Sequence, residues 1–316
     1  MKVTLKLRQK KEMEEKALNL FISDLDGTLL DSGAVVSLRS RRILNRLLDA
    51  GVLFTVASAR TPLSAVSILE DLHLQLPVIL MNGAMIYDVA GNRILEAEGF
   101  SEQEIRKLAG AETAAGVTGA LITESEGRLE LNLGDDGNGL SRECFRIDEV
   151  KKNPSVKGVR FGRPAADLGK ERVLYGLYAD RKPDRLKKMA EFLSADSALT
   201  LDFYRDRYDD RRWCLEITSG HISKKQGALY LKRQYPQARL VGFGDGINDI
   251  PLCEACEEFH AVAGACAGLL EKADGVIGSC REDGVAAYLE KWWEKHEKDF
   301  TGEPLPAEHG GKGQTI

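Results

Sequence analysis

Two aspartates, Asp24 and Asp26, stand directly after an apolar run and directly before a Gly-Thr pair. The run, residues 20–22, has the composition of a buried strand, and Gly27 permits a tight bend after it. Carboxylates at the carboxyl end of a strand in a parallel sheet can meet a substrate and a metal ion. The alternative is a strand followed by an ordinary turn, because Asp and Gly are common turn residues. Other segments of the chain decide between these two interpretations.

Two later apolar runs also end in polar side chains. Ser58 follows residues 52–57, and Asp245 follows residues 240–244. The carboxyl ends of parallel strands meet at one edge of a sheet, so we expect both side chains to lie beside Asp24. Ser58 could instead be a plain helix cap. The pattern predicts a site that is assembled from separate segments of the chain.

Four carboxylates are expected at this edge of the sheet, those of Asp24, Asp26, Asp245 and Asp249. Each pair would repel by roughly 1 kcal/mol at 4 Å in bulk water, and by more in a partly buried site, so a cation is expected among them. Oxygen ligands without Cys or His indicate a hard cation, and Mg²⁺ fits best because it takes few carboxylates, water and substrate phosphate oxygens. A phosphorylated substrate follows from this choice of metal.

The carboxylates are expected to have different roles in phosphoryl transfer. Asp24 is the predicted nucleophile, since a carboxylate can attack phosphorus in line and form an aspartyl phosphate. Asp26 is the predicted acid, which protonates the leaving oxygen and later takes a proton from water. Asp245 is expected to bind the metal, and Asp249 to orient Asp245 or a metal-bound water.

Three further side chains are expected to contact the phosphate: Ser58, Lys224 and Asn248. Lys224 stands in the segment 222–229, shortly before the last catalytic strand, where the amino terminus of a helix would bring it to the same edge. A solvated helix start is the alternative for Lys224, and a plain cap is the alternative for Asn248.

The elements that position these residues follow an alternating pattern. Apolar runs at 20–22, 52–57 and 77–81 are separated by segments with helical spacing, which predicts a parallel sheet with right-handed crossovers. From about Tyr87 the texture changes to a separate module of helices and alternating strands, and the first pattern resumes at 240–244. We therefore expect an α/β fold with two parts.

The motifs resemble, in order and spacing, those of the haloacid dehalogenase-like hydrolases, in particular the Cof-type phosphatases with a type IIB cap. They are DLDGTL at 24–29, ASAR at 57–60, NGA at 82–84, SKKQG at 223–227 and GDGIND at 244–249. The resemblance implies a Rossmann-like parallel-sheet core with an inserted α/β cap, and Mg²⁺-dependent hydrolysis of phosphomonoesters. It implies that Asp24 is the nucleophile and Asp245 a metal ligand. It also implies that Asp26 is the acid/base and, through its backbone carbonyl, a metal ligand.

The resemblance also implies a division of the chain. The core is expected to comprise residues 17–85 and 218–298, with the specificity-determining cap, residues 86–217, inserted between them. The mostly charged residues 1–16 are expected to form an amino-terminal arm, and residues 299–316 a disordered tail. Four cap arginines could contact a second anionic group or simply face solvent: Arg160, Arg163, Arg205 and Arg211.

The composition is that of a globular protein, with 43% hydrophobic and 29% charged residues in a chain of 316. The formal net charge of -5 argues against a broadly basic nucleic-acid surface. No window approaches the ~18 apolar residues of a membrane span, and the amino terminus is unlike a secretory signal. We therefore expect a cytoplasmic protein that acts on a small phosphorylated metabolite, with sugar phosphates favoured by the resemblance, and that has no nucleic-acid, membrane or obligate protein partner.

Two other functions stay open. A phosphomutase would form the same aspartyl phosphate but pass it to another hydroxyl rather than to water. A non-catalytic metabolite-binding protein could use the same fold, although an intact set of Asp24, Asp26, Lys224 and Asp245 argues against it. The sequence leaves the identity of the substrate and the oligomeric state open.

Overall fold

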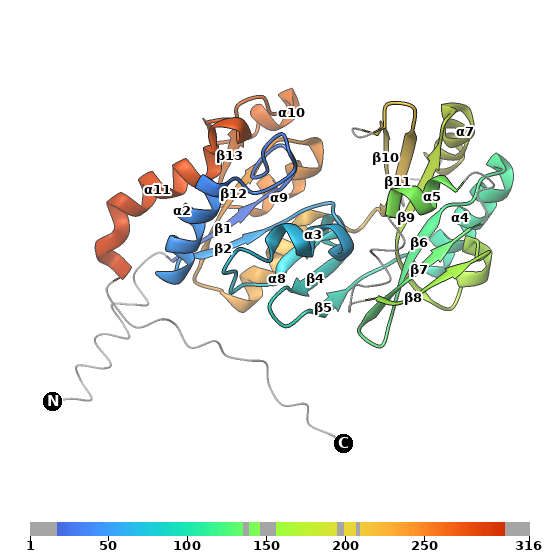
Figure 1. Cartoon of the computed structure of the whole chain (residues 1–316), viewed down its shortest axis with the longest axis horizontal. Helices are drawn as coiled ribbons and strands as arrows, with labels where there is room; N and C mark the ends of the chain where they lie inside the picture. The colour runs from blue at the N-terminus through green and yellow to red at the C-terminus, as the bar shows by residue number, and fades with distance from the viewer. Residues whose placement is uncertain (1–17, 135–138, 146–155, 195–198, 207–208, 301–316) are drawn as a thin grey trace, which may run out of the picture.

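The computed structural model describes residues 18–134, 139–145, 156–194, 199–206 and 209–300 (Figure 1). These residues form three sheets with surrounding helices. The expected arm at 1–16 and the expected tail beyond Phe300 lie outside the described residues. Within the described part, no helix is long and apolar enough to cross a membrane.

The first sheet has five strands, all parallel, in the order β14-β13-β12-β1-β2. The interior position of β1, between β12 and β2, follows from its sequence, because side chains on both of its faces are apolar and buried. The bounds are β1 Asn19–Ser23, β2 Leu53–Val56, β12 Arg239–Gly244, β13 Glu258–Val262 and β14 Gly275–Ile277. The structure therefore confirms the parallel-sheet α/β core.

Helices cover both faces of this sheet. Phe21 of β1 packs in one cluster with residues of α2 and α11, whereas Leu20 and Ile22 pack in another with residues of α8 and α9. This alternation along β1 is the period of two expected for a strand. The helix bounds are α2 Leu38–Asp49, α3 Pro62–Leu69, α8 Lys224–Gln234, α9 Ile250–Ala255, α10 Ala267–Leu270 and α11 Gly284–His296.

A small antiparallel sheet extends the core beyond β2. It contains β3 (Val78–Leu80), β4 (Met85–Asp88) and β5 (Arg93–Ala97) in sequence order. The sequence predicts the run 77–81 as a third parallel strand, but β3 meets the end of β2 only at an isolated parallel bridge, Ala57–Ile79. The short turn after β3 leads directly into β4, and a two-stranded hairpin of this kind is antiparallel.

The second large sheet has six strands in the order β10-β11-β9-β6-β7-β8, and we call it the cap sheet. All its neighbouring strands are antiparallel except β7 and β8. The bounds are β6 Ala120–Ser125, β7 Arg128–Leu133, β8 Val156–Phe161, β9 Arg172–Asp180, β10 Leu199–Arg205 and β11 Trp213–Ser219. This additional sheet agrees with the predicted inserted α/β part.

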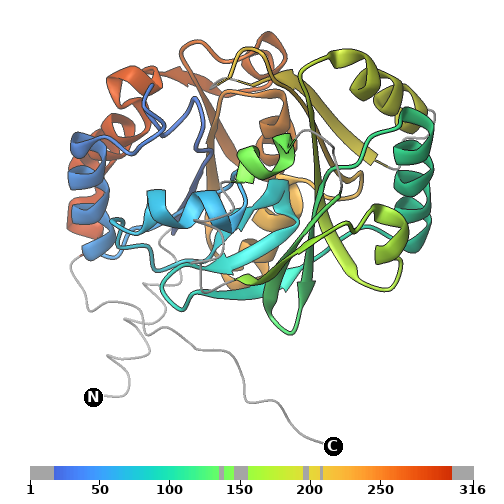
Figure 2. The same ribbon diagram turned by 45° about the vertical axis from the view of Figure 1, so that its right-hand side comes forward.

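Two helices, α4 (Glu102–Ala115) and α7 (Pro183–Ser194), cover the outer face of the cap sheet, away from the core (Figures 1 and 2). Apolar side chains of both helices, Leu108 and Met189 among them, pack with Leu215 and Ile217 of β11. The other face of the cap sheet is turned toward the core, with the short helix α5 (Leu140–Phe145) packed on it. Side chains on that inner face can therefore approach the core.

The two connections between the core and the cap sheet contact each other. His221, which follows β11, lies 2.9 Å from Glu98 in the first connection through its Nε2 atom. Its Nδ1 atom lies 2.6 Å from the hydroxyl of Ser219, and that hydroxyl donates to Glu104 at 2.5 Å. Glu104 also completes a capping box with Ser101 at the start of α4. These contacts link the chain segment that leads into the cap sheet with the segment that leads out of it.

Candidate active site

Asp24 is the first residue after β1, and its carboxylate contacts a buried lysine. The backbone N–H of Asp24 continues the parallel pairing by donating to Phe243 of β12 at 2.9 Å. Lys224, the first residue of α8, donates from Nζ to Oδ1 of Asp24 at 2.5 Å and to Oδ1 of Asp249 at 2.6 Å. The side chains of Lys224 and Asp249 are 0% exposed, so this ion triad is shielded from water. A solvated helix start is therefore wrong for Lys224.

The pKa values of Asp24 and Lys224 are both shifted by burial and by the neighbouring charges. Burial raises the pKa of Asp24, the charges of Asp249 and Asp245 add to this effect, and Lys224 opposes it. Burial by itself would lower the pKa of Lys224, but its contacts with Asp24 and Asp249 outweigh burial and raise it. Lys224 is therefore the stable cation of the group. Lys224 contacts two of the three neighbouring carboxylates, so negative charge is left for a metal ion or a substrate to balance.

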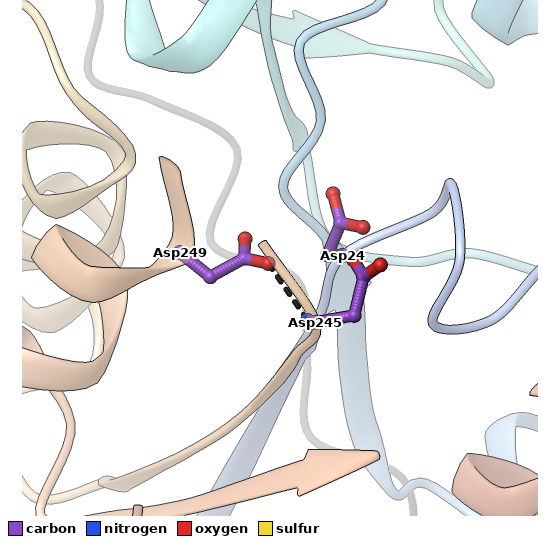
Figure 3. Close-up of side chains that lie close together, drawn as sticks. All are labelled: Asp24, Asp245 and Asp249. Atoms are coloured by element: carbon purple, nitrogen blue, oxygen red, sulfur yellow. Dashed lines mark hydrogen bonds between the residues drawn. The ribbon is translucent and has the colours of Figure 1, made fainter. Parts of the chain in front are cut away.

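Asp249 holds the loop after β12 in shape. Its Oδ2 atom accepts the backbone N–H groups of Asp245 and Gly246, each at 2.9 Å, while its Oδ1 atom is held by Lys224. Figure 3 shows the carboxylates of Asp24, Asp245 and Asp249 gathered at one point. One oxygen from each carboxylate lies within 4.8 Å of the others. The support that Asp249 gives to Asp245 is therefore direct.

The loops after β1 and β12 fit closely against each other. Gly27 has a φ of +89°, and a Cβ atom at this position would lie 2.2 Å from Oδ2 of Asp245. Only glycine satisfies both the backbone conformation and the space. The hydroxyl of Thr28 donates to Oδ1 of Asp245 at 3.3 Å. The Gly-Thr pair that follows the two aspartates thus positions a carboxylate that is distant in the sequence.

The three carboxylates fit a hard divalent cation. All their donors are oxygens, which suits Mg²⁺ and not a thiolate- or imidazole-preferring metal. The cradle left by Gly27 keeps a carboxylate oxygen of Asp245 close to the backbone of the first loop. Asp24 and Asp245 are the residues best placed to hold the ion, with Asp249 behind them.

The carboxylate of Asp26 is held apart from this group by Arg60. The guanidinium donates from Nε to Oδ2 at 2.6 Å and from Nη2 to Oδ1 at 2.7 Å, which is a two-pronged ion pair. Arg60 is itself anchored, because its backbone N–H donates to the hydroxyl of buried Ser58 at 3.1 Å. The sequence alone predicts no role for Arg60, although it closes the ASAR motif.

Ser58 and Asn248 meet at a third loop. The carbonyl of Ser58 accepts the backbone N–H of Asn82 at 3.0 Å, and the amide of Asn248 donates to Oδ1 of Asn82 at 3.2 Å. Gly83 has a φ of +103°, and a Cβ atom there would lie 2.1 Å from the carbonyl oxygen of Ser223. This close approach packs the NGA motif against the start of α8, and so places Ser58 and Asn248 around the same loop.

The match to known proteins spans most of the chain. Residues 21–289 match the family described as haloacid dehalogenase-like hydrolases. The chain belongs to this family. The predicted family is thereby confirmed. Relatives of this hydrolase match it over most of its length. A 5-amino-6-(5-phospho-D-ribitylamino)uracil phosphatase of Bacillus subtilis is 24% identical over 85% of this chain and 96% of its own. A putative phosphatase of Buchnera aphidicola is 25% identical over 88% of this chain and 97% of its own.

Solved structures have the same fold as this hydrolase. A haloacid dehalogenase-like hydrolase from Bacteroides thetaiotaomicron superimposes with a TM-score of 0.66 and 19% identity, over 88% of this chain and 100% of the other. A sugar phosphatase of HAD subclass IIB superimposes with a TM-score of 0.65 and 18% identity, over 87% of this chain and 98% of the other. At these identities the likeness establishes the fold.

The seven predicted site residues of the hydrolase fall into three neighbouring groups. The buried group contains Asp24, Asp249 and Lys224, with Asp245 beside it; the second is Asp26 on Arg60; the third is Ser58 and Asn248 around Asn82. The structure thus places all seven near the carboxyl ends of β1, β2 and β12. Arg60 and Asn82 are neighbours for which the sequence alone predicts no role in the site.

Proposed function

We propose that this protein is a Mg²⁺-dependent phosphatase that hydrolyses a small phosphomonoester through an aspartyl phosphate on Asp24. The observation that carries the proposal is the carboxylate of Asp24, which follows β1, contacts Lys224, and has oxygens of Asp245 and Asp249 within 4.8 Å. Relatives named as phosphatases of 5-amino-6-(5-phospho-D-ribitylamino)uracil and of HMP-PP support a small phosphorylated substrate.

Asp24 would attack the phosphorus atom of the substrate. Since Lys224 holds Oδ1 of Asp24, we assign the attack to Oδ2. A bond forms between this oxygen and phosphorus while the bond from phosphorus to the ester oxygen breaks, and a water molecule then hydrolyses the aspartyl phosphate. The cation of Lys224 offsets negative charge on the carboxylates and on the phosphoryl oxygens.

Asp26 would protonate the leaving oxygen and then take a proton from the attacking water. In the structure both of its oxygens accept hydrogen bonds from Arg60. At least one of these bonds must open before Asp26 can carry a proton to the substrate. Arg60 therefore acts as a positioning residue that keeps Asp26 outside the Asp24 group.

The remaining predicted residues bind the metal and the phosphate. When bound, Mg²⁺ would neutralise charge on the phosphoryl oxygens and on the carboxylates. Asp24, Asp245 and the backbone carbonyl of Asp26 would hold it, with Asp249 contributing through its contacts with Asp245. The phosphate would be contacted by Lys224, by the hydroxyl of Ser58 and by the amide of Asn248.

We further propose that residues 86–217 serve as a cap that selects the substrate, inserted in a core of residues 17–85 and 218–298. The inner face of the cap sheet, which is turned toward the core, supports this division. The expected cytoplasmic location stays a prediction.

The test is release of inorganic phosphate from a panel of phosphorylated metabolites in the presence of Mg²⁺. We expect turnover by the wild type, loss of turnover on chelation, and a loss of about 10³-fold or more in Asp24→Asn. Asp184→Asn, an exposed aspartate in the first turn of α7, is the matched control and should retain full activity. Equal phosphate release by the wild type and Asp24→Asn would overturn the proposal.

A further inference from the structure

The inner face of the cap sheet carries two carboxyl groups that oppose each other across β10 and β11. Leu215 and Ile217 of β11 pack against the outer helices, so Glu216 between them points to the inner face. Asp202 of β10 is paired with Glu216 in the antiparallel register, and side chains of paired residues lie on the same face. Asp202 is exposed there, whereas Glu216 is partly buried, and a carboxyl group that is withdrawn from water is usually paired.

Two tyrosines hold Glu216. The hydroxyl of Tyr204 donates to Oε1 of Glu216 at 2.5 Å, and Tyr175 of β9 is a second hydrogen-bond donor to it. Burial raises the pKa of Glu216, and the charges of Asp202 and of Asp26 add to this effect. Asp26 belongs to the core, so Glu216 lies close enough to the proposed acid to respond to its charge. We call Glu216, Asp202, Tyr204 and Tyr175 the Glu216 cluster.

The position of the cluster determines which part of a substrate it can meet. In the proposed reaction the phosphoryl group lies at Asp24, and the leaving oxygen lies at Asp26. The organic part of the substrate extends from that oxygen. Glu216 lies on the face of the cap sheet that is turned toward the core, so a group that extends past Asp26 toward that face approaches Glu216.

Six arginines of the described part of the chain, each a possible partner for a second phosphate, have other contacts. Arg60 is held by Asp26, and Arg212, just before β11, donates from two nitrogens to Asp206. The four arginines considered from the sequence have other partners: Arg160 with Glu130, Arg163 with Glu171, Arg211 with Asp209, and Arg205 over the ring of Trp213. The cluster itself presents carboxylate and phenol oxygens, which suit hydrogen-bond donors.

We propose that Glu216, held in place by Tyr204 and Tyr175, binds the organic part of the substrate through hydroxyl or ammonium donors and disfavours a second phosphate. The substrate class is then a monophosphate with donor groups in its organic part. This inference rests on the proposed phosphatase function. A site that hydrogen-bonds a substrate donor discriminates strongly against analogues without it, because its own polar groups are left unpaired.

The test compares kcat/KM of the Mg²⁺-loaded protein for four probes: p-nitrophenyl phosphate, ribitol phosphate, glucosamine phosphate and fructose bisphosphate. Glu216→Gln should lower the ratio of kcat/KM for ribitol or glucosamine phosphate to that for p-nitrophenyl phosphate by about tenfold to a hundredfold, mainly through KM. Tyr204→Phe should lower the same ratio by about threefold to tenfold, because it frees Glu216 to move. The matched control Glu191→Gln, on the exposed side of α7, should leave the ratios of kcat/KM between the probes unchanged.

The outcomes separate the two levels of the argument. A loss confined to ribitol phosphate identifies hydroxyls as the bound donors, and a loss confined to glucosamine phosphate identifies the ammonium group. Equal ratios in the wild type and Glu216→Gln, or a wild-type preference for fructose bisphosphate, would overturn the inference while leaving the phosphatase intact. Absence of Mg²⁺-dependent, Asp24-dependent turnover with every probe would instead overturn the proposed function itself.

Discussion

Replacing Lys224 by methionine should destabilise the protein strongly, because it leaves two buried carboxylates without their cation. Methionine keeps a similar length but carries no charge. At an effective dielectric constant of about 20, each contact of Lys224 with a carboxylate, at 2.5 and 2.6 Å, contributes about 6 kcal/mol of attraction. Removing the lysine also removes the cost of burying it. We therefore expect the free energy of unfolding to fall by about 3–5 kcal/mol, as is usual when one partner of a buried ion pair is removed.

Urea unfolding at neutral pH, with Mg²⁺ removed, measures this loss. Lys225→Met is the matched control, since the side chain of Lys225 is 40% exposed and its Nζ atom lies 3.6 Å from Glu254. An exposed pair of this kind contributes less than about 1 kcal/mol. Activity should be lost in Lys224→Met and kept in Lys225→Met.

A double variant tests the physical reason for the loss. Carboxylate oxygens of Asp24 and Asp249 within 4.8 Å repel by about 3 kcal/mol at the same dielectric constant. Asp249→Asn removes this repulsion, so it should recover about 2–3 kcal/mol when added to Lys224→Met, although it destabilises the wild type. Changes in the free energy of unfolding that simply add in the double variant would refute the reasoning. A decrease in Lys224→Met that is no larger than in Lys225→Met would refute it as well.

Three further substitutions probe other parts of the structure. Arg60→Lys cannot form the two-pronged contact with Asp26 and should lower kcat by about tenfold in the phosphate-release assay, whereas an unchanged kcat would contradict the positioning role. Gly27→Ala should destabilise the fold by more than about 1 kcal/mol in thermal unfolding and abolish activity, since its Cβ would lie 2.2 Å from Asp245; full activity would show that the loops are not so tightly packed. Burial raises the pKa of Glu112 from 4.5 to about 7, so the fold favours its protonated form. The free energy of unfolding should therefore fall by about 3 kcal/mol between these two pH values relative to Glu112→Gln, and parallel pH profiles would contradict this.

The sequence was sufficient for the architecture of the core, because local signals and topology agree there. The apolar runs before Asp24 and before Asp245 have the length of buried strands, and parallel strands bring their carboxyl ends to one edge. The structure has these two runs as neighbouring strands, β1 and β12. The short run at β3 was harder to interpret, because three apolar residues do not reveal whether their partner strand is parallel or antiparallel.

Contacts between distant segments could not be read from the sequence. Arg60 and Asp26 are 34 positions apart, and their ion pair depends on how the loops after β1 and β2 face each other. Glu216 is ordinary in its strand, and its relation to Asp26 depends on the placement of the cap sheet over the core. Local patterns encode the face on which a side chain lies, but not what lies opposite that face.

Trapping the phosphorylated protein tests the central claim most directly. The Mg²⁺-loaded wild type is mixed with a phosphomonoester that it hydrolyses, quenched in acid during turnover, and analysed by intact mass and peptide mapping. We predict a fraction of the protein that carries one added phosphoryl group, located in the peptide with Asp24 and absent from Asp24→Asn. Turnover without a phosphorylated protein, or a phosphoryl group on another residue, would contradict the account.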